Sequence, residues 1–213
     1  MTRAYVLVDR ESWRPFFTLV FFAGLALVLS VPGVRTVGNL AGASLLVRTP
    51  TFFYTLALFM GLLGLGIGAT SAERGERGAR MVRCLLLRVL LGELLVLPYL
   101  VFSRALFPGR EGAFALVVLY TTLVSLLCAI VSRLVEQPLR WRSSTGFLVK
   151  YVLFLSYNAV PLAGIPFLSP LGATRILLEG ATPAATAAAF AVPCALLGVF
   201  VPFALHVGGK ERV

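Results

Sequence analysis

Six long apolar runs dominate this sequence and decide the solvent in which it can fold. The runs cover residues 15–34, 49–71, 85–107, 112–132, 147–165 and 182–207. A helix needs about 20 mostly apolar residues to cross the roughly 30 Å hydrocarbon core of a bilayer. Apolar residues make up 59% of the chain and charged residues only 13%, too few to cover a soluble domain of 213 residues. The pattern predicts an all-α polytopic membrane protein, with residues 1–213 forming a single domain of six transmembrane helices.

The basic residues are distributed unevenly between the two sides of such a bundle. With the N-terminus in the cytoplasm, 14 of the 19 Lys and Arg residues fall in residues 1–14, 71–88, 133–150 and the C-terminal tail. Cytoplasmic loops are enriched in these residues. We therefore expect both termini to be cytoplasmic, which requires an even number of spans. The net charge of +10 then indicates topology rather than nucleic-acid binding.

Glycine and proline shape the predicted bundle. Gly64 and Gly68 stand four residues apart in the second run. This spacing either allows a neighbouring helix to approach closely or reflects the general frequency of glycine in membrane helices. Pro98, Pro193 and Pro202 are expected to bend the third and sixth spans. Residues 165–180 are broken by prolines and are expected to form an outer or re-entrant segment rather than one straight helix.

Few residues could support catalysis. No phosphate loop, nucleophile elbow or zinc-binding helix motif occurs, and neither the single histidine, His206, nor the three cysteines have metal-ligand spacing. We expect no catalytic residue, metal or cofactor, and no enzymatic activity in this chain. Glu93 is the only acid well inside a predicted span. It is either a functional carboxylate or a side chain that reaches a basic neighbour at the interface.

The inside loop at residues 71–88 is rich in charge. If it is helical, Glu73 faces Arg77 and Glu76 faces Arg80 at the i, i+4 spacing. Met81, Val82 and Leu85 would then form an apolar face, as in a small amphipathic helix lying at the cytoplasmic interface. The alternative is an ordinary loop enriched in basic residues.

The chain resembles a small permease of the type-2 ATP-binding-cassette family. Permeases of that family carry an acidic-basic stretch, typically Glu-x-x-x-Gly, before a coupling helix that docks on a separate ATPase subunit. Residues 73–78 and 78–87 stand at these places, and Gly92-Glu93 stands where the family shows Gly-Lys. Leu168-Ser169-Pro170 matches an element that the family carries before its last span. The resemblance implies the following residues for partner coupling: Glu73, Arg74, Glu76, Arg77, Gly78, Arg80 and Arg83. For a transport path it suggests Glu93, Ser169 and Pro170.

The resemblance implies a permease subunit in a bacterial plasma (inner) membrane. Its expected partners are an ATP-binding-cassette ATPase subunit, a second permease copy or paralogue, and membrane lipid, with no nucleic acid. ATP hydrolysis would take place in the partner subunit. The alternatives are a gradient-driven small-molecule carrier, a membrane enzyme and a non-transporting membrane assembly protein.

Overall fold

The computed structural model describes residues 13–30, 51–73, 76, 78–106, 111–136, 143–159, 166–179 and 182–207. All regular elements in these ranges are helical, which confirms the predicted all-α class. They are α1 (Trp13–Ser30), α3 (Thr51–Glu73), α4 (Gly78–Leu106), α5 (Glu111–Glu136), α6 (Ser143–Ala159), the 3-10 turn η3 (Pro166–Leu168), α7 (Pro170–Glu179) and α8 (Pro183–Val207).

Four of the described helices, α3, α4, α5 and α8, are long and apolar enough to cross a membrane. They correspond to the second, third, fourth and sixth predicted spans. The apolar part of α1 is shorter, and α6 has 17 residues, or about 25 Å at 1.5 Å per residue. The described part of the chain therefore has the character of a membrane-embedded helical protein.

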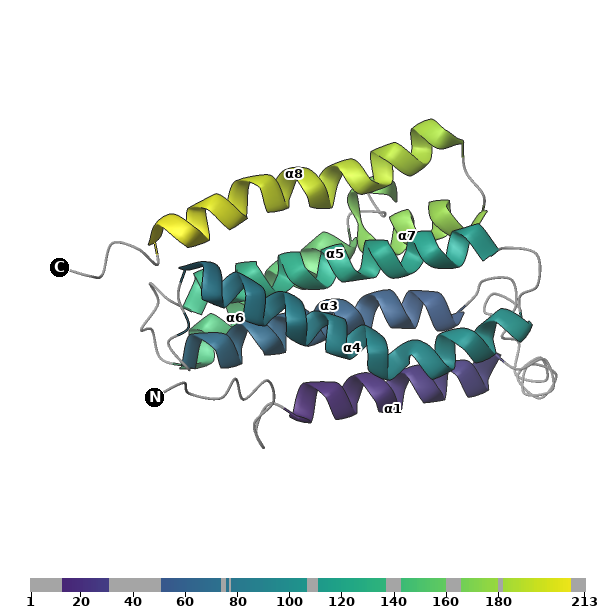
Figure 1. The fold of residues 1–213 in the computed structure, drawn as a ribbon, viewed down its shortest axis with the longest axis horizontal. Helices are drawn as coiled ribbons and strands as arrows, with labels where there is room; N and C mark the ends of the chain where they lie inside the picture. The colour runs from purple at the N-terminus through teal and green to yellow at the C-terminus, as the bar shows by residue number, and fades with distance from the viewer. Residues whose placement is uncertain are drawn as a thin grey trace.

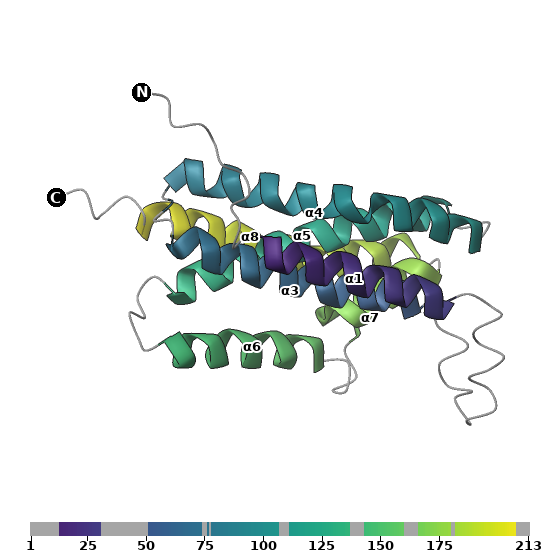
Figure 2. The same ribbon diagram turned by 90° about the horizontal axis from the view of Figure 1, so that it is seen from below.

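The long helices form an antiparallel bundle. Figure 1 shows α1, α3, α4, α5, α6 and α8 running along the same axis in alternating directions, so that α1 begins and α8 ends at the same end of the molecule. The helix α5 packs against α3, α4, α6, α7 and α8. Figure 2 shows α6 at the edge of the bundle, beside α3 and α5.

The closest helix pair is α3 and α5, and two glycines on α3 allow the approach. A Cβ atom on Gly64 would lie 2.1 Å from the Ser125 carbonyl oxygen, and one on Gly68 would lie 2.2 Å from the Ala129 carbonyl oxygen. Both distances are far inside van der Waals contact. The prediction that this glycine pair lets a neighbouring helix approach is confirmed.

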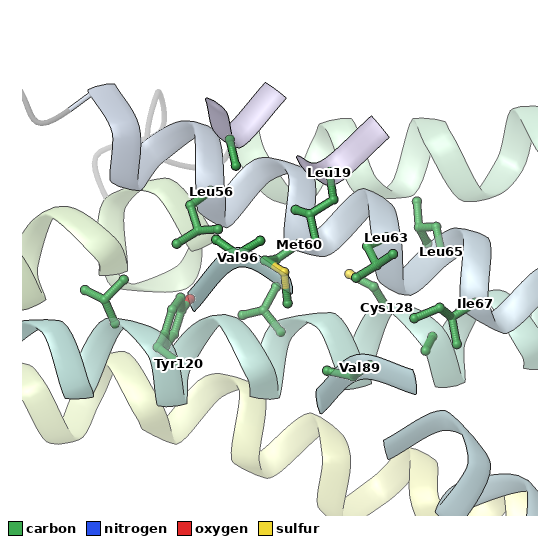
Figure 3. Packing of buried hydrophobic residues seen from close by; sticks show 14 of the residues in the cluster. Leu19, Leu56, Met60, Leu63, Leu65, Ile67, Val89, Val96, Tyr120 and Cys128 are labelled. Carbon is green, nitrogen blue, oxygen red and sulfur yellow. The ribbon is translucent and has the colours of Figure 1, made fainter. Parts of the chain in front are cut away.

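The apolar core lies between α3, α5 and the helices that flank them. Leu56, Met60 and Leu63 of α3 are almost fully buried. Figure 3 shows these side chains between Leu19 of α1, Val96 of α4 and Tyr120 of α5. The described residues of this core belong to one connected cluster, so a shift of α3 disturbs every neighbour.

We expect Gly64→Ala and Gly68→Ala each to destabilise the protein by about 1–3 kcal/mol, because the added methyl group collides with the α5 backbone. The measurement is the thermal unfolding of the purified chain in a mild detergent. Gly198→Ala on α8 is the matched control, since nothing lies within 4 Å of its Cβ position. Equal melting temperatures for all three variants would contradict the close packing of α3 and α5.

Candidate functional site

The connection between α3 and α4 is organised by one carboxylate. Glu76 accepts two hydrogen bonds from the Arg88 guanidinium, with Nη2–Oε1 at 2.5 Å and Nη1–Oε2 at 3.1 Å. The hydroxyl of Ser71, at the end of α3, donates to the same Oε2 over 2.8 Å. A bidentate arginine–carboxylate pair fixes both position and orientation. Glu76 therefore joins the last turns of α3 to the third turn of α4.

The backbone of Glu76 extends this contact to a third helix. Its carbonyl oxygen accepts a hydrogen bond from Arg133 Nη2 of α5 at 3.1 Å, and its amide donates to the Ser71 carbonyl at 3.3 Å. Arg88 is only 1% exposed and Arg133 only 4%. Buried guanidinium groups are stable only when they are paired and hydrogen-bonded. The residues Ser71, Glu76, Arg88 and Arg133, here called the Glu76 cluster, therefore hold the ends of α3, α4 and α5 together.

The structure corrects the prediction of a separate amphipathic helix before the third span. Residues 78–87 are the first part of α4, which continues without a break to Leu106. Met81 and Leu85, expected on an interfacial apolar face, are at most 2% exposed and belong to the bundle core. The apolar face is real, but it packs against protein because the helix enters the bundle directly.

The expected i, i+4 pairing across residues 73–80 is also wrong for Glu76. The helix α3 ends at Glu73, Glu76 is not helical, and α4 begins at Gly78, whose φ of +55° lies in the left-handed region that glycine adopts easily. With this break in the helix, Glu76 turns toward Arg88, twelve residues further along the chain. Arg74, Arg77 and the side chain of Glu73 lie outside the described part of the structure, so the Glu73–Arg77 pair stays a prediction.

Arg80 and Arg83 are exposed on the first two turns of α4. Arg83 precedes Arg88 by five residues, or about 7.5 Å along the helix axis, and it lies on the exposed side of α4 while Arg88 is buried. A partner that contacts these arginines would touch the part of α4 that the cluster anchors.

Glu93 occupies a different environment, further along α4. It is 8% exposed, and its Oε1 accepts hydrogen bonds from Thr121 and Thr122 of α5 at 2.9 and 3.0 Å. Among the described residues Glu93 forms no ion pair, and its Oε2 is buried without a hydrogen-bond partner. The expectation of a basic neighbour is therefore not met within this part of the chain.

The two threonines can stabilise Glu93 in either protonation state. Thr121 Oγ1 also lies 3.0 Å from the Val117 carbonyl oxygen, and Thr122 Oγ1 lies 2.8 Å from that of Val118. Each hydroxyl has one proton, which it donates either to Glu93 or to its own helix. A protonated Glu93 can donate to a threonine oxygen while the threonine donates to the backbone.

Ser169 and Pro170 begin α7. The Ser169 hydroxyl accepts the Gly172 amide at 3.0 Å, and Pro170 is the first helical residue, where its missing N–H costs nothing. Both residues are buried. The capping of α7 accounts for the serine and the proline at positions 169 and 170. Among the described residues, no hydrogen bond connects this helix start to Glu93. The suggested transport path through Glu93, Ser169 and Pro170 therefore stays a prediction.

The described residues contain no group of three His, Cys, Asp or Glu side chains that could hold a metal ion. Cys84 and Cys128 are buried and Cys194 is exposed, and none forms a disulfide. The burial of Cys84 and Cys128 agrees with a packing role for these two residues.

We expect Arg88→Met to destabilise the protein by about 3–5 kcal/mol, because the Glu76 carboxylate would lose its counter-ion at a partly buried position. Unfolding of the purified chain by denaturant in detergent micelles measures the change. Arg83→Met is the matched control, an exposed arginine five residues earlier on the same helix, whose loss should change stability by less than about 0.5 kcal/mol. The double variant Glu76→Gln/Arg88→Met should recover part of the loss. If Arg88→Met were no more destabilising than Arg83→Met, the Glu76 cluster would not anchor these helices.

No family model matches this chain, and no curated protein or solved structure matches it.

Proposed function

We propose that the chain is the permease subunit of an ATP-binding-cassette transporter, embedded in a bacterial inner membrane and driven by a separate ATPase subunit. The observation that carries the proposal is the Glu76 cluster. A loop that receives force from a soluble partner must be rigidly attached to the helices that it moves. Glu76 connects the α3–α4 loop to Ser71 on α3, Arg88 on α4 and Arg133 on α5.

In this proposal the chain crosses the membrane six times, with both termini in the cytoplasm. The alternating directions of α1, α3, α4, α5, α6 and α8 support this topology, as does the return of α8 to the end where α1 begins. In this topology the short helices α1 and α6 correspond to the first and fifth spans. The Glu76 cluster, Arg80 and Arg83 then lie at the cytoplasmic face, as the excess of basic residues there favours.

The partner would bind the exposed arginines of α4. Arg80 and Arg83 begin a stripe along one helix face that continues into the membrane with exposed apolar side chains, namely Leu87, Leu90, Leu94, Leu97 and Val101. The spacing of three and four residues keeps all of them on one side of α4. A second permease copy would pack on the apolar part of the stripe, and the transport path would lie between the two copies.

Co-purification tests the proposal. We expect a tagged chain, extracted from its native membrane in a mild detergent, to bring with it an ATPase subunit that contains a phosphate loop. Native mass spectrometry of the complex should give two permease copies. Reversing a contact charge with Arg83→Glu should reduce the recovered ATPase at least about tenfold, because like charges at an interface cost more than the roughly 1.4 kcal/mol that this factor requires.

The control is Arg175→Glu on α7, which removes an exposed i, i+4 pair with Glu179 away from the α3–α4 loop. It should leave the recovered ATPase unchanged. The chain emerging without any ATPase, from membranes in which other transporters of this class stay assembled, would contradict the proposal. An equal loss with both variants would show that the effect does not depend on the α4 surface.

A gradient-driven carrier is the second candidate, and the surroundings of Glu93 favour it. A buried carboxyl group whose two threonine neighbours accommodate either protonation state is suited to accepting and releasing a proton.

Reconstituted vesicles distinguish this candidate from the first. If the chain is a proton-coupled carrier, vesicles that contain it alone should dissipate an imposed pH gradient faster than empty vesicles, as reported by an enclosed pH-sensitive dye. Glu93→Gln should abolish the difference, while Glu179→Gln on the exposed end of α7 should keep it. A proton flux that is unchanged in Glu93→Gln would exclude Glu93 as the proton-carrying group.

A further inference from the structure

The surroundings of Glu93 contain more closely spaced oxygen atoms than protons to join them. Thr121 Oγ1 lies 2.9 Å from Glu93 Oε1, and Thr122 Oγ1 lies 3.0 Å from the same atom. Both hydroxyl oxygens also lie within 3.0 Å of carbonyl oxygens of their own helix, those of Val117 and Val118. Each threonine has one hydroxyl proton, so two protons serve the three contacts of Thr121 and the two of Thr122. Oxygen atoms that approach so closely without a proton between them repel each other unless a positive charge lies beside them.

The Glu93 carboxylate also lacks the positive charge that would balance it. It is 8% exposed, forms no ion pair among the described residues, and its Oε2 is buried without a hydrogen-bond partner. Glu93 stands near the middle of the 29 residues of α4, so in a membrane both aqueous faces would be distant. An unbalanced carboxylate at such a depth is costly. One bound monovalent cation would neutralise it, and coupling ions of membrane carriers are bound near the bilayer midplane.

The chemistry of the available ligands selects the kind of cation. Carboxylate and hydroxyl oxygens are ligands for hard cations. The described residues contain no group of three His, Cys, Asp or Glu side chains, and with one carboxylate a divalent ion would leave a net positive charge buried in hydrocarbon. A monovalent ion leaves the site neutral. Because the oxygen atoms of Glu93, Thr121 and Thr122 lie 2.9–3.0 Å apart, they suit a small ion such as Na⁺ better than the larger K⁺.

We infer that Glu93, Thr121 and Thr122 form a Na⁺ site in the middle of the bundle. Glu93 Oε1 and the two threonine Oγ1 atoms, which already converge, would be ligands, and the unpartnered Oε2 offers a fourth. Each threonine would then donate its proton to a carbonyl oxygen of its own helix and present a lone pair to the ion. A role for Na⁺ as the coupling ion rests on the carrier proposal above, whereas binding of Na⁺ is measured without transport.

Binding of radioactive sodium to the purified full chain in detergent, measured by scintillation proximity, tests the site. We expect one Na⁺ per chain, displaced by unlabelled Na⁺ and at least about tenfold less effectively by K⁺. Glu93→Gln should abolish binding, because the neutral amide no longer balances the ion. Thr121→Val and Thr122→Val should each weaken it by about tenfold or more, whereas Thr121→Ser should keep it, since serine retains the hydroxyl ligand. The threonine variants decide the matter if Glu93→Gln fails to fold.

Two variants away from the site are the controls, and both should bind Na⁺ like the native chain. Thr18→Val removes a hydroxyl that donates to the Arg14 carbonyl at an exposed position of α1. Glu179→Gln removes an exposed carboxylate of α7. The inference would be overturned by a native chain that binds no Na⁺, by equal displacement with K⁺, or by native binding in a folded Glu93→Gln or Thr121→Val variant. Proton flux in Na⁺-free vesicles, with a chain that binds no Na⁺, would overturn the Na⁺ site and leave the carrier proposal standing.

Discussion

The contact of α3 with α5 at Gly64 and Gly68 sets the geometry of the whole bundle. In a bilayer the hydrophobic effect gives helices little reason to associate, so close backbone approach and the packing that it permits must hold them together. The two glycines bring α3 against the carbonyl groups of Ser125 and Ala129, and the Ser132 hydroxyl donates to the Leu65 carbonyl at 2.8 Å in the same interface. Because α1, α4 and α7 also pack on α3, the position of this helix determines theirs.

Polar side chains fix how the helices are arranged at the end of the bundle, beyond the close packing of α3 and α5. Charges are costly within hydrocarbon, and the chain concentrates its buried arginines at one end of the bundle, around Glu76. There the cost is offset by the bidentate pair and by the contacts of Ser71 and Arg133. Glu93 is the exception, since its partners among the described residues are the hydroxyl groups of Thr121 and Thr122. The proposed carrier function would account for a carboxyl group placed there, since an apolar side chain would fill the same place with less penalty.

The sequence predicted the helical class and the approximate place of each described long helix, because apolar runs report burial or lipid contact directly. It also pointed to Gly64 and Gly68, although only the structure identified α5 as the partner. Residues 78–87 were misread as a separate helix, since Met81 and Leu85 have the same spacing whether they face lipid or protein. Arg88, Arg133, Thr121 and Thr122 were not identified as site residues at all. Their partners lie 12 or more residues away along the chain, and single-sequence patterns contain no information on contacts between helices.

The continuity of α4 changes how the two candidate functions relate to each other. Its 29 residues include the exposed Arg83, the anchored Arg88 and the buried Glu93. Pro98 cannot donate a backbone hydrogen bond to the carbonyl of Leu94, so the weakest point of the helix lies beyond Glu93. The part of α4 from Gly78 to Glu93 should therefore move as one rigid unit about 22 Å long. A push on Arg83 would strain the Glu76 cluster and shift Glu93 against its threonines in the same movement. Under either proposal, Glu93 and the exposed surface around Arg83 would thus be mechanically linked through α4.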